Sequence, residues 1–112
     1  MGDARSDVLQ GTLDLMVMKT LETMGALHSY AIARRLQQIS EDALQLNQGT
    51  LYPALVRLQQ QGLISGSWRL TENGRRAKYY ELTRAGRKEL AAKLEGWERT
   101  VSLMSRVIRA EE

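Results

Sequence analysis

The sequence predicts a mainly α-helical fold with one small β-hairpin. Four segments carry apolar residues at the spacing of a helix, and two alternating segments flank an Asn-Gly pair. With 112 residues, the chain is long enough for one small domain with a modest core. It contains no cysteine, which excludes a disulfide scaffold, a thiolate zinc site and a cysteine nucleophile.

The first helix is expected over residues 12–24, because glycine commonly ends helices and Gly25 follows this segment. A helix that is apolar on most sides needs cover from more than one direction, which a domain this small rarely provides. We therefore expect a second subunit to pack against it. Its apolar residues are Leu13, Val17, Leu21 and Met24 on one face, and Leu9, Leu15, Met16 and Met18 elsewhere.

Polar residues interrupt the apolar run of this first segment, at Asp14 and Lys19. No segment approaches the ~20 consecutive apolar residues of a membrane span, and no charged leader precedes an apolar run. The sequence therefore predicts a cytoplasmic protein without membrane contact.

The second helix is expected over residues 29–39, with Ser29 as its N-cap. Tyr30 and Arg34 lie one turn apart on its surface, where both side chains would reach a phosphate group. A partly packed tyrosine and a solvated arginine fit the same pattern equally well. Three apolar positions should face the core: Ile32, Leu36 and Ile39.

The third helix contains the single proline of the chain, within NQGTLYPALVRLQQQG. A proline in the middle of a helix removes a backbone donor and costs about 3 kcal/mol. If Asn47 caps this helix, Pro53 lies in its second turn, and Gly49 leaves room for a backbone or a phosphate to approach. One apolar stripe should face the core: Leu51, Ala54, Leu55 and Leu58.

After Gly62 the apolar pattern changes to alternation, so that LISGSWRL and AKYYEL predict two strands joined by TENGRR. Trp68 and Leu70 share one face of the first strand, and Tyr80 and Leu82 share one face of the second. An Asn-Gly pair between alternating runs is typical of a hairpin, because both residues tolerate the positive φ of a tight turn.

The net charge is only +3, but positive charge is concentrated between Arg57 and Lys88. That stretch holds eight basic side chains against two acidic ones, and Arg75, Arg76 and Lys78 crowd the hairpin. A concentrated positive field attracts polyanions, among which nucleic acid is the usual one. The charge alone is equally compatible with a solvated basic face.

Three helices, a charged hairpin and a last helix follow one another in the order of a winged helix-turn-helix. In helix-turn-helix proteins, the N-terminal residues of the recognition helix contact bases in the major groove of DNA. A winged helix used only for protein interaction is the rival interpretation, and it does not require the arginines of the hairpin. The hairpin charge therefore favours DNA.

Catalysis is not supported by the sequence. His28 is the single histidine, Glu41 and Asp42 are adjacent in a linker, and HEXXH, GXSXG and P-loop motifs are absent. Neighbouring linker acids are more often solvated than paired for acid-base chemistry. We expect no enzyme activity, no metal and no cofactor.

The segments GTLYPALVRLQQQGLI and GRRAKYYELTRAGRKEL, with a tryptophan between them, resemble the PadR family of bacterial transcriptional regulators, in particular its short members. The similarity extends over nearly the whole chain, with one departure at Ser29, where the family often has glycine. The resemblance implies a homodimeric transcriptional repressor that binds a palindromic operator in double-stranded DNA. A winged-helix domain would span residues 1–82 and a C-terminal dimerisation helix residues 83–112.

The resemblance also implies where DNA is contacted. Tyr52 has an alternative place in the core, because aromatic residues of small domains pack more often than they recognise. The hairpin, or wing, would reach the phosphate backbone or the neighbouring minor groove through Arg69, Asn73, Arg75, Arg76 and Lys78. The start of the third helix would lie at the major groove through Asn47, Gln48, Gly49, Thr50, Tyr52, Pro53 and Arg57.

The last helix supports a dimer independently, because its apolar residues recur about every 3.5 positions, as in helices that pack side by side. Packing within one chain is the alternative. Two copies of Trp97 would meet across the dimer axis, where they either cement the interface or bind a flat apolar or cationic effector. The expected interface comprises Leu9, Leu13, Met16, Leu90, Leu94, Trp97, Val101, Met104 and Ile108.

Overall fold

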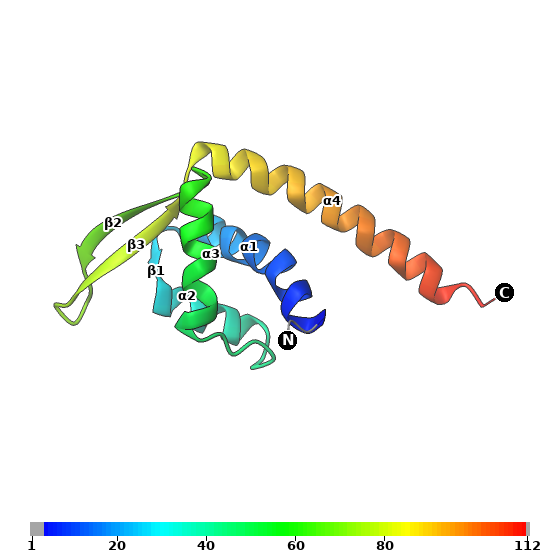
Figure 1. Ribbon diagram of the computed structural model, residues 1–112, viewed down its shortest axis with the longest axis horizontal. Coiled ribbons are helices and arrows are strands. Elements are labelled where there is room, and N and C mark those ends of the chain that lie inside the picture. The colour runs from blue at the N-terminus through cyan, green and yellow to red at the C-terminus, as the bar shows by residue number, and fades with distance from the viewer. Residues whose placement is uncertain (1–3, 112) are drawn as a thin grey trace.

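The computed structural model describes the backbone of residues 4–111 and the side chains of residues 12–111. Figure 1 shows a helical body from which a β-hairpin projects on one side and a long helix on the other. This arrangement confirms the predicted fold class, a mainly α-helical winged helix-turn-helix. The described elements are α1 (Ala4–Met24), β1 (Leu27–His28), α2 (Ser29–Ile39), α3 (Gln48–Gln60), β2 (Ile64–Leu70), β3 (Arg76–Leu82) and α4 (Arg84–Arg109).

A single apolar core joins the three helices of the body to the sheet and to the start of α4. Helix α1 lies at its centre, in contact with α2, α3, α4 and β3. The body itself therefore covers much of the apolar surface of residues 12–24, for which the sequence predicted a second subunit. The core consists of Leu13, Val17, Met18, Leu21, Ile32, Leu36, Leu51, Ala54, Leu55, Leu58, Ile64, Tyr80, Leu82 and Leu90.

The start of α2 differs from the prediction. His28, not Ser29, is the N-cap, and its Nδ1 accepts the backbone N–H of Ala31 at 3.3 Å. His28 is also the last residue of β1, an edge strand that adds to the two strands of the hairpin. Strand β1 is antiparallel to β3, with Leu27 opposite Tyr80 and His28 opposite Tyr79. At the other end of α2, Ile39 is the last residue of the helix and is exposed rather than packed in the core as predicted.

The predicted N-cap of α3 is confirmed, since Oδ1 of Asn47 accepts the backbone N–H of Thr50 at 2.9 Å. Pro53 accordingly lies in the second turn, and the carbonyl of Gly49 cannot receive the usual helical bond from it. A Cβ at Gly49 would lie 3.2 Å from the capping oxygen of Asn47. Both Gly49 and Pro53 are exposed, while the predicted stripe of α3 is buried against the core.

The connection between β2 and β3 comprises residues 71–75, one residue fewer than the predicted TENGRR. The N–H of Thr71 donates to the carbonyl of Arg75 at 2.7 Å, and the N–H of Gly74 donates to the carbonyl of Thr71 at 2.9 Å. Within the turn, Gly74 has a φ of 77° but Asn73 does not adopt a positive φ. The Asn-Gly pair thus marks the hairpin correctly, although its glycine alone supplies the left-handed residue.

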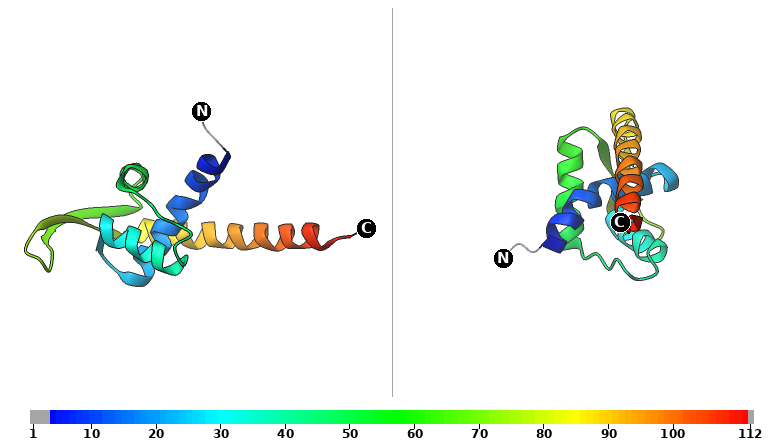
Figure 2. Two further views of the ribbon diagram at one scale, coloured as in Figure 1. Left: turned by 90° about the horizontal axis from the view of Figure 1, so that it is seen from below. Right: turned by 90° about the vertical axis from the view of Figure 1, so that its right-hand side faces the viewer.

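Helix α4 begins at a cap on Thr83, whose hydroxyl accepts the N–H of Gly86 and donates to the carbonyl of Gly62. Gly86 and Leu90 are buried in the body and Leu94 packs against its core, whereas the later turns project away from it as a straight arm (Figure 2). In the part of the chain that the structure describes, none of the helices has the length and apolar character of a membrane span.

Candidate nucleic-acid interface

The outward surface at the start of α3 is formed by uncharged residues. Gly49, Thr50 and Pro53 are exposed, and Gln48 is half-buried beside them. Tyr52 is 54% exposed, so its alternative place in the core is excluded. Gly49 and Pro53, one turn apart, have little or no side chain to keep another molecule away from the helix backbone at these two positions.

A shallow groove of about 340 Å³ separates α3 from the wing. It is lined by Tyr52, Val56, Gln59 and Gln60 of α3 and by Lys78 and Tyr80 of β3. Burial raises the pKa of Tyr80, and the nearby Tyr52 adds to that shift, so the Tyr80 hydroxyl stays protonated. The groove makes one continuous surface of α3 and the wing.

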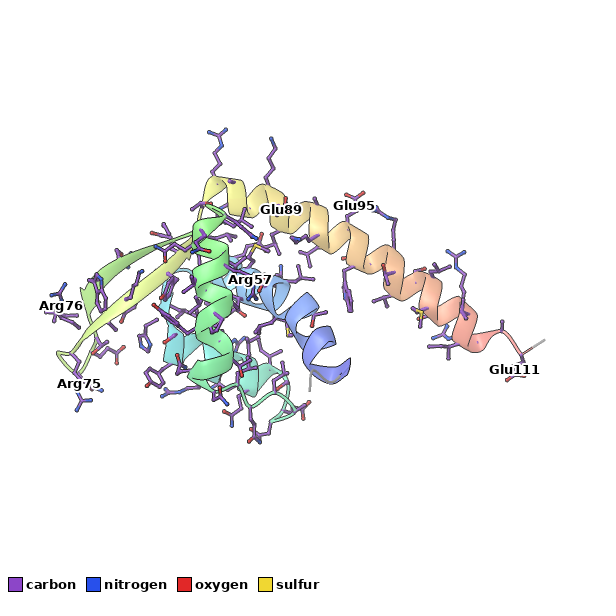
Figure 3. The ribbon with its side chains drawn as sticks, viewed as in Figure 1. Arg57, Arg75, Arg76, Glu89, Glu95 and Glu111 are labelled. Carbon is purple, nitrogen blue, oxygen red and sulfur yellow. The ribbon has the colours of Figure 1, made fainter. Side chains whose placement is uncertain are left out.

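The predicted wing residues gather on the projecting hairpin, where Arg75 and Arg76 point away from the body (Figure 3). Arg69 lies 5.3 Å from the ring centroid of Tyr79 and pairs loosely with Glu81 at 3.7 Å. The ammonium group of Lys78 lies 5.6 Å from the ring centroid of Tyr80. Aromatic rings therefore support cationic side chains along the wing.

Tyr30 and Arg34 of α2 come together with the wing in a second hollow. Tyr30 is 68% exposed, and both side chains line a cleft of about 590 Å³ opposite Asn73, Arg75 and Arg76. The guanidinium groups of Arg34 and Arg75 and the phenol of Tyr30 outnumber the one carboxylate of this cleft, that of Glu72, and they suit an anionic group such as phosphate. The two elements that carry the predicted phosphate contacts thus face each other.

Arg57 does not lie on this surface. Its guanidinium binds Asp14 of α1 through two bonds, Nη2 to Oδ1 at 2.7 Å and Nε to Oδ2 at 3.3 Å. The hydrogen bond to Asp14 raises the pKa of Arg57. Arg57 points from α3 toward α1 (Figure 3), so in this structure the guanidinium predicted to contact DNA links two helices of the body.

Replacing Asp14 by asparagine is expected to lower the free energy of unfolding by about 1–2 kcal/mol, because a two-bond, partly buried ion pair is lost. Urea titration followed by circular dichroism measures this change. Glu22→Gln is the matched control, since Glu22 pairs with Lys19 at an exposed site and should change stability by less than about 0.5 kcal/mol. Equal effects of the two variants would contradict a special role for the Asp14–Arg57 pair.

The predicted dimer residues differ in how far they are buried. Leu13 and Leu90 are 2% and 0% exposed in the chain's own core, so they have no surface left for a second subunit. Met16 and Leu94 are half-buried and line an apolar groove of about 410 Å³ between α1, α2 and α4, together with Trp97. The side chain of Leu9 lies outside the described residues.

The arm of α4 exposes the remaining predicted interface residues. Two more apolar side chains, Leu103 and Val107, widen this exposed stripe beyond the predicted 3.5-residue seam. Such a stripe, without cover in the described chain, is typical of a surface that binds another protein. The exposed apolar residues of the arm are Trp97, Val101, Leu103, Met104, Val107 and Ile108.

The helices, the three-stranded sheet and the basic wing define the chain as a winged helix-turn-helix protein. Residues 17–92 match the model of the transcriptional regulator PadR-like family. The chain belongs to this family of transcriptional regulators, as the motifs around α3 and β3 predicted.

Solved structures with the same fold support this assignment. A transcriptional regulator from Clostridium thermocellum is 27% identical, with a TM-score of 0.82 over 92% of this chain and 99% of that one. A PadR family transcription regulator from Clostridium difficile is 30% identical, with a TM-score of 0.75 over 88% and 99% of the two chains. A PadR-like transcriptional regulator from Bacillus cereus shares the fold at 22% identity, with a TM-score of 0.81 over 94% and 99%.

Proposed function

We propose that this transcriptional regulator is a homodimeric repressor that binds a palindromic operator in double-stranded DNA. The observation that carries the proposal is the continuous surface of α3 and the basic wing, linked by the groove between Tyr52 and Lys78. A winged helix that served only protein interaction would not require exposed arginines at the tip of its hairpin. A duplex polyanion matches them.

In this proposal, the start of α3 enters the major groove. Asn47, Gln48, Thr50 and Tyr52 present polar groups to base edges or to neighbouring phosphates. The exposed Gly49 and Pro53 let the helix approach the DNA closely, which gives the proline in the second turn a functional reason. Tyr30 and Arg34 hold a phosphate from the side of α2.

The apolar stripe on the α4 arm and the adjoining groove support the proposed dimer. An isologous pair has a two-fold axis, so its two α3 helices would read inverted half-sites. Such a dimer on an operator that overlaps a promoter represses by excluding the polymerase. The effector role of Trp97 stays a prediction, and the groove beside this residue offers the space for it.

Replacing both Arg75 and Arg76 by alanine is expected to flatten the salt dependence of DNA binding. Each neutralised phosphate contributes about −0.9 to the slope of log K against log salt, so the slope should change by roughly one to two units. Fluorescence anisotropy with labelled duplex DNA measures it. The double variant Arg106→Ala/Arg109→Ala removes the same charge from the end of α4 and should leave the slope unchanged. An unchanged slope in the wing variant removes the wing from the DNA contacts.

Changes at Gln48 are expected to alter which sequences are bound, because a lost base contact costs about 1–3 kcal/mol at one position of the site. Selection on a random-sequence library compares the preferred motif of Gln48→Ala with that of the parent. Gln61→Ala, at the opposite end of α3, is the control and should recover the parent motif. The same motif from Gln48→Ala would show that this position does not read bases.

A further inference from the structure

Two large apolar side chains of the wing have no role in the core and none in the contacts above. Trp68 is 61% exposed and Leu70 is 69% exposed. Both belong to β2, where Trp68 pairs with Lys78 and Leu70 with Arg76 across the antiparallel ladder. Because opposite residues of such a pair point to the same side, these four side chains share one face of the hairpin.

This face of the wing is continuous with the exposed side of α3. Toward the body, the same alternation places Ile64, Tyr80 and Leu82 on it, and all three are buried in the core. Lys78 and Tyr80 then line the groove shared with Tyr52 of α3. The opposite face of the hairpin carries Tyr79, whose ring contacts that of His28, its register partner on the neighbouring strand β1, edge-on at 5.3 Å.

Trp68 is paired with a cation. The guanidinium carbon of Arg76 lies 5.5 Å from the centroid of the indole ring, in the range of a cation–π interaction. The pair therefore presents a flat apolar surface and a positive charge side by side. Leu70 extends the apolar part toward the tip, where Arg75 adds a further charge.

The positive charge of this surface indicates which kind of molecule it binds. An apolar protein surface would match Trp68 and Leu70 but would leave Arg75, Arg76 and Lys78 without compensation. The minor groove of duplex DNA offers both parts, because its walls are deoxyribose rings and its edges are phosphates. Apolar side chains beside cations are a common means of minor-groove binding.

We propose that Trp68 and Leu70 are DNA contacts that pack against the deoxyribose wall of the minor groove next to the half-site, while Arg76, held across the indole, binds the adjoining phosphate. This inference rests on the proposed DNA-binding function and adds an apolar contribution to it. Wing binding accordingly has a part that salt does not screen, since apolar burial releases no counterions.

The first test compares affinities at several salt concentrations, using a duplex that the parent protein selects from a random-sequence library. Trp68→Ala should weaken binding about tenfold at every salt concentration, because part of an aromatic side chain loses its cover, and should leave the slope unchanged. Leu70→Ala should act in the same way. Arg76→Gln should instead reduce the slope by about one. Met24→Ala is the matched control, an exposed apolar residue at the end of α1 that should bind like the parent.

The second test uses the fluorescence of Trp68 itself. Acrylamide, a neutral quencher, should reach Trp68 less readily once the selected duplex is added. Trp68→Phe retains Trp97 as its single tryptophan and should lose this DNA-dependent protection. Both wing residues are exposed, so the variants should keep the parent's thermal unfolding, and circular dichroism verifies it.

The outcomes separate this inference from the function on which it rests. If the parent selects a duplex, yet Trp68→Ala/Leu70→Ala binds it like the parent and Trp68 stays open to acrylamide, the apolar wing contact is overturned and DNA binding stands. A reduced slope in Trp68→Ala with normal affinity at high salt also overturns it, because Trp68 would then act only by positioning Arg76. If the parent selects no duplex, both proposals are overturned.

Discussion

Gly86→Ala is expected to lower the free energy of unfolding by about 3 kcal/mol, among the largest effects of a single methyl group in this protein. A Cβ at Gly86 would collide with the carbonyl oxygen of Leu63 and lie 2.8 Å from Cδ1 of Leu82. The carbonyl belongs to the backbone and also accepts the N–H of Thr83 at 3.1 Å, so it cannot give way without opening the junction. The midpoint temperature of thermal unfolding should fall by roughly 12 °C.

Gly96→Ala is the matched control in the same helix. The nearest atom to its added Cβ is the flexible end of Arg99, at 3.8 Å. Alanine is favoured over glycine inside a helix by about 0.5–1 kcal/mol, so this variant should be slightly more stable than the parent. Equal destabilisation by the two substitutions would show that the collision at Gly86 is relieved by movement of the chain.

Replacing both Val101 and Met104 by aspartate is expected to dissociate the proposed dimer and to abolish tight DNA binding. Two charges placed in an apolar interface should raise the dimer dissociation constant by at least about a hundredfold, since each unpaired charge costs several kcal/mol. Sedimentation equilibrium should then give the 12.7 kDa mass of one chain instead of twice that mass. Loss of one half-site contact weakens operator binding accordingly.

The control is Ser102→Asp, which adds an exposed charge to the same helix between the two positions. At 100° per residue, Ser102 lies about 100° from Val101 and about 160° from Met104 around α4, on a different side of the helix from the two aspartates. This variant should remain dimeric and bind DNA. A parent protein that sediments as a single chain would refute the proposed homodimer directly.

Local signals explain which parts of the fold could be predicted. The cap at Asn47, the buried stripe of α3 and the hairpin are all set by residues within a few positions of one another, and each was predicted from them. The cap of α2 was misplaced because a serine next to His28 is the commoner capping residue. The two residues of β1 are too few to show any period.

Contacts between distant residues could not be predicted from the sequence. Asp14 and Arg57 are 43 positions apart, and no spacing rule joins a carboxylate on α1 to a guanidinium on α3. Periodicity likewise placed Leu13 and Leu90 on the apolar faces of their helices. It cannot distinguish a face that packs within the chain, as both residues do, from a face that packs against a second chain. The wing residues were predicted by charge, whereas the exposure of Trp68 became apparent only from the structure.

The α4 arm has a consequence for how the regulator responds to its own abundance. Beyond Trp97, about three turns of helix extend from the body, and an isolated helix of this length is marginally stable in water. In a lone chain these turns should fray, and hydrogen exchange there should be fast. Association would then order the arm and bury its apolar stripe together, so both processes would depend on protein concentration. Occupancy of a two-half-site operator would then rise steeply with the number of regulator molecules in the cell. The coupled folding and association of one helix would thus set a threshold concentration for operator binding.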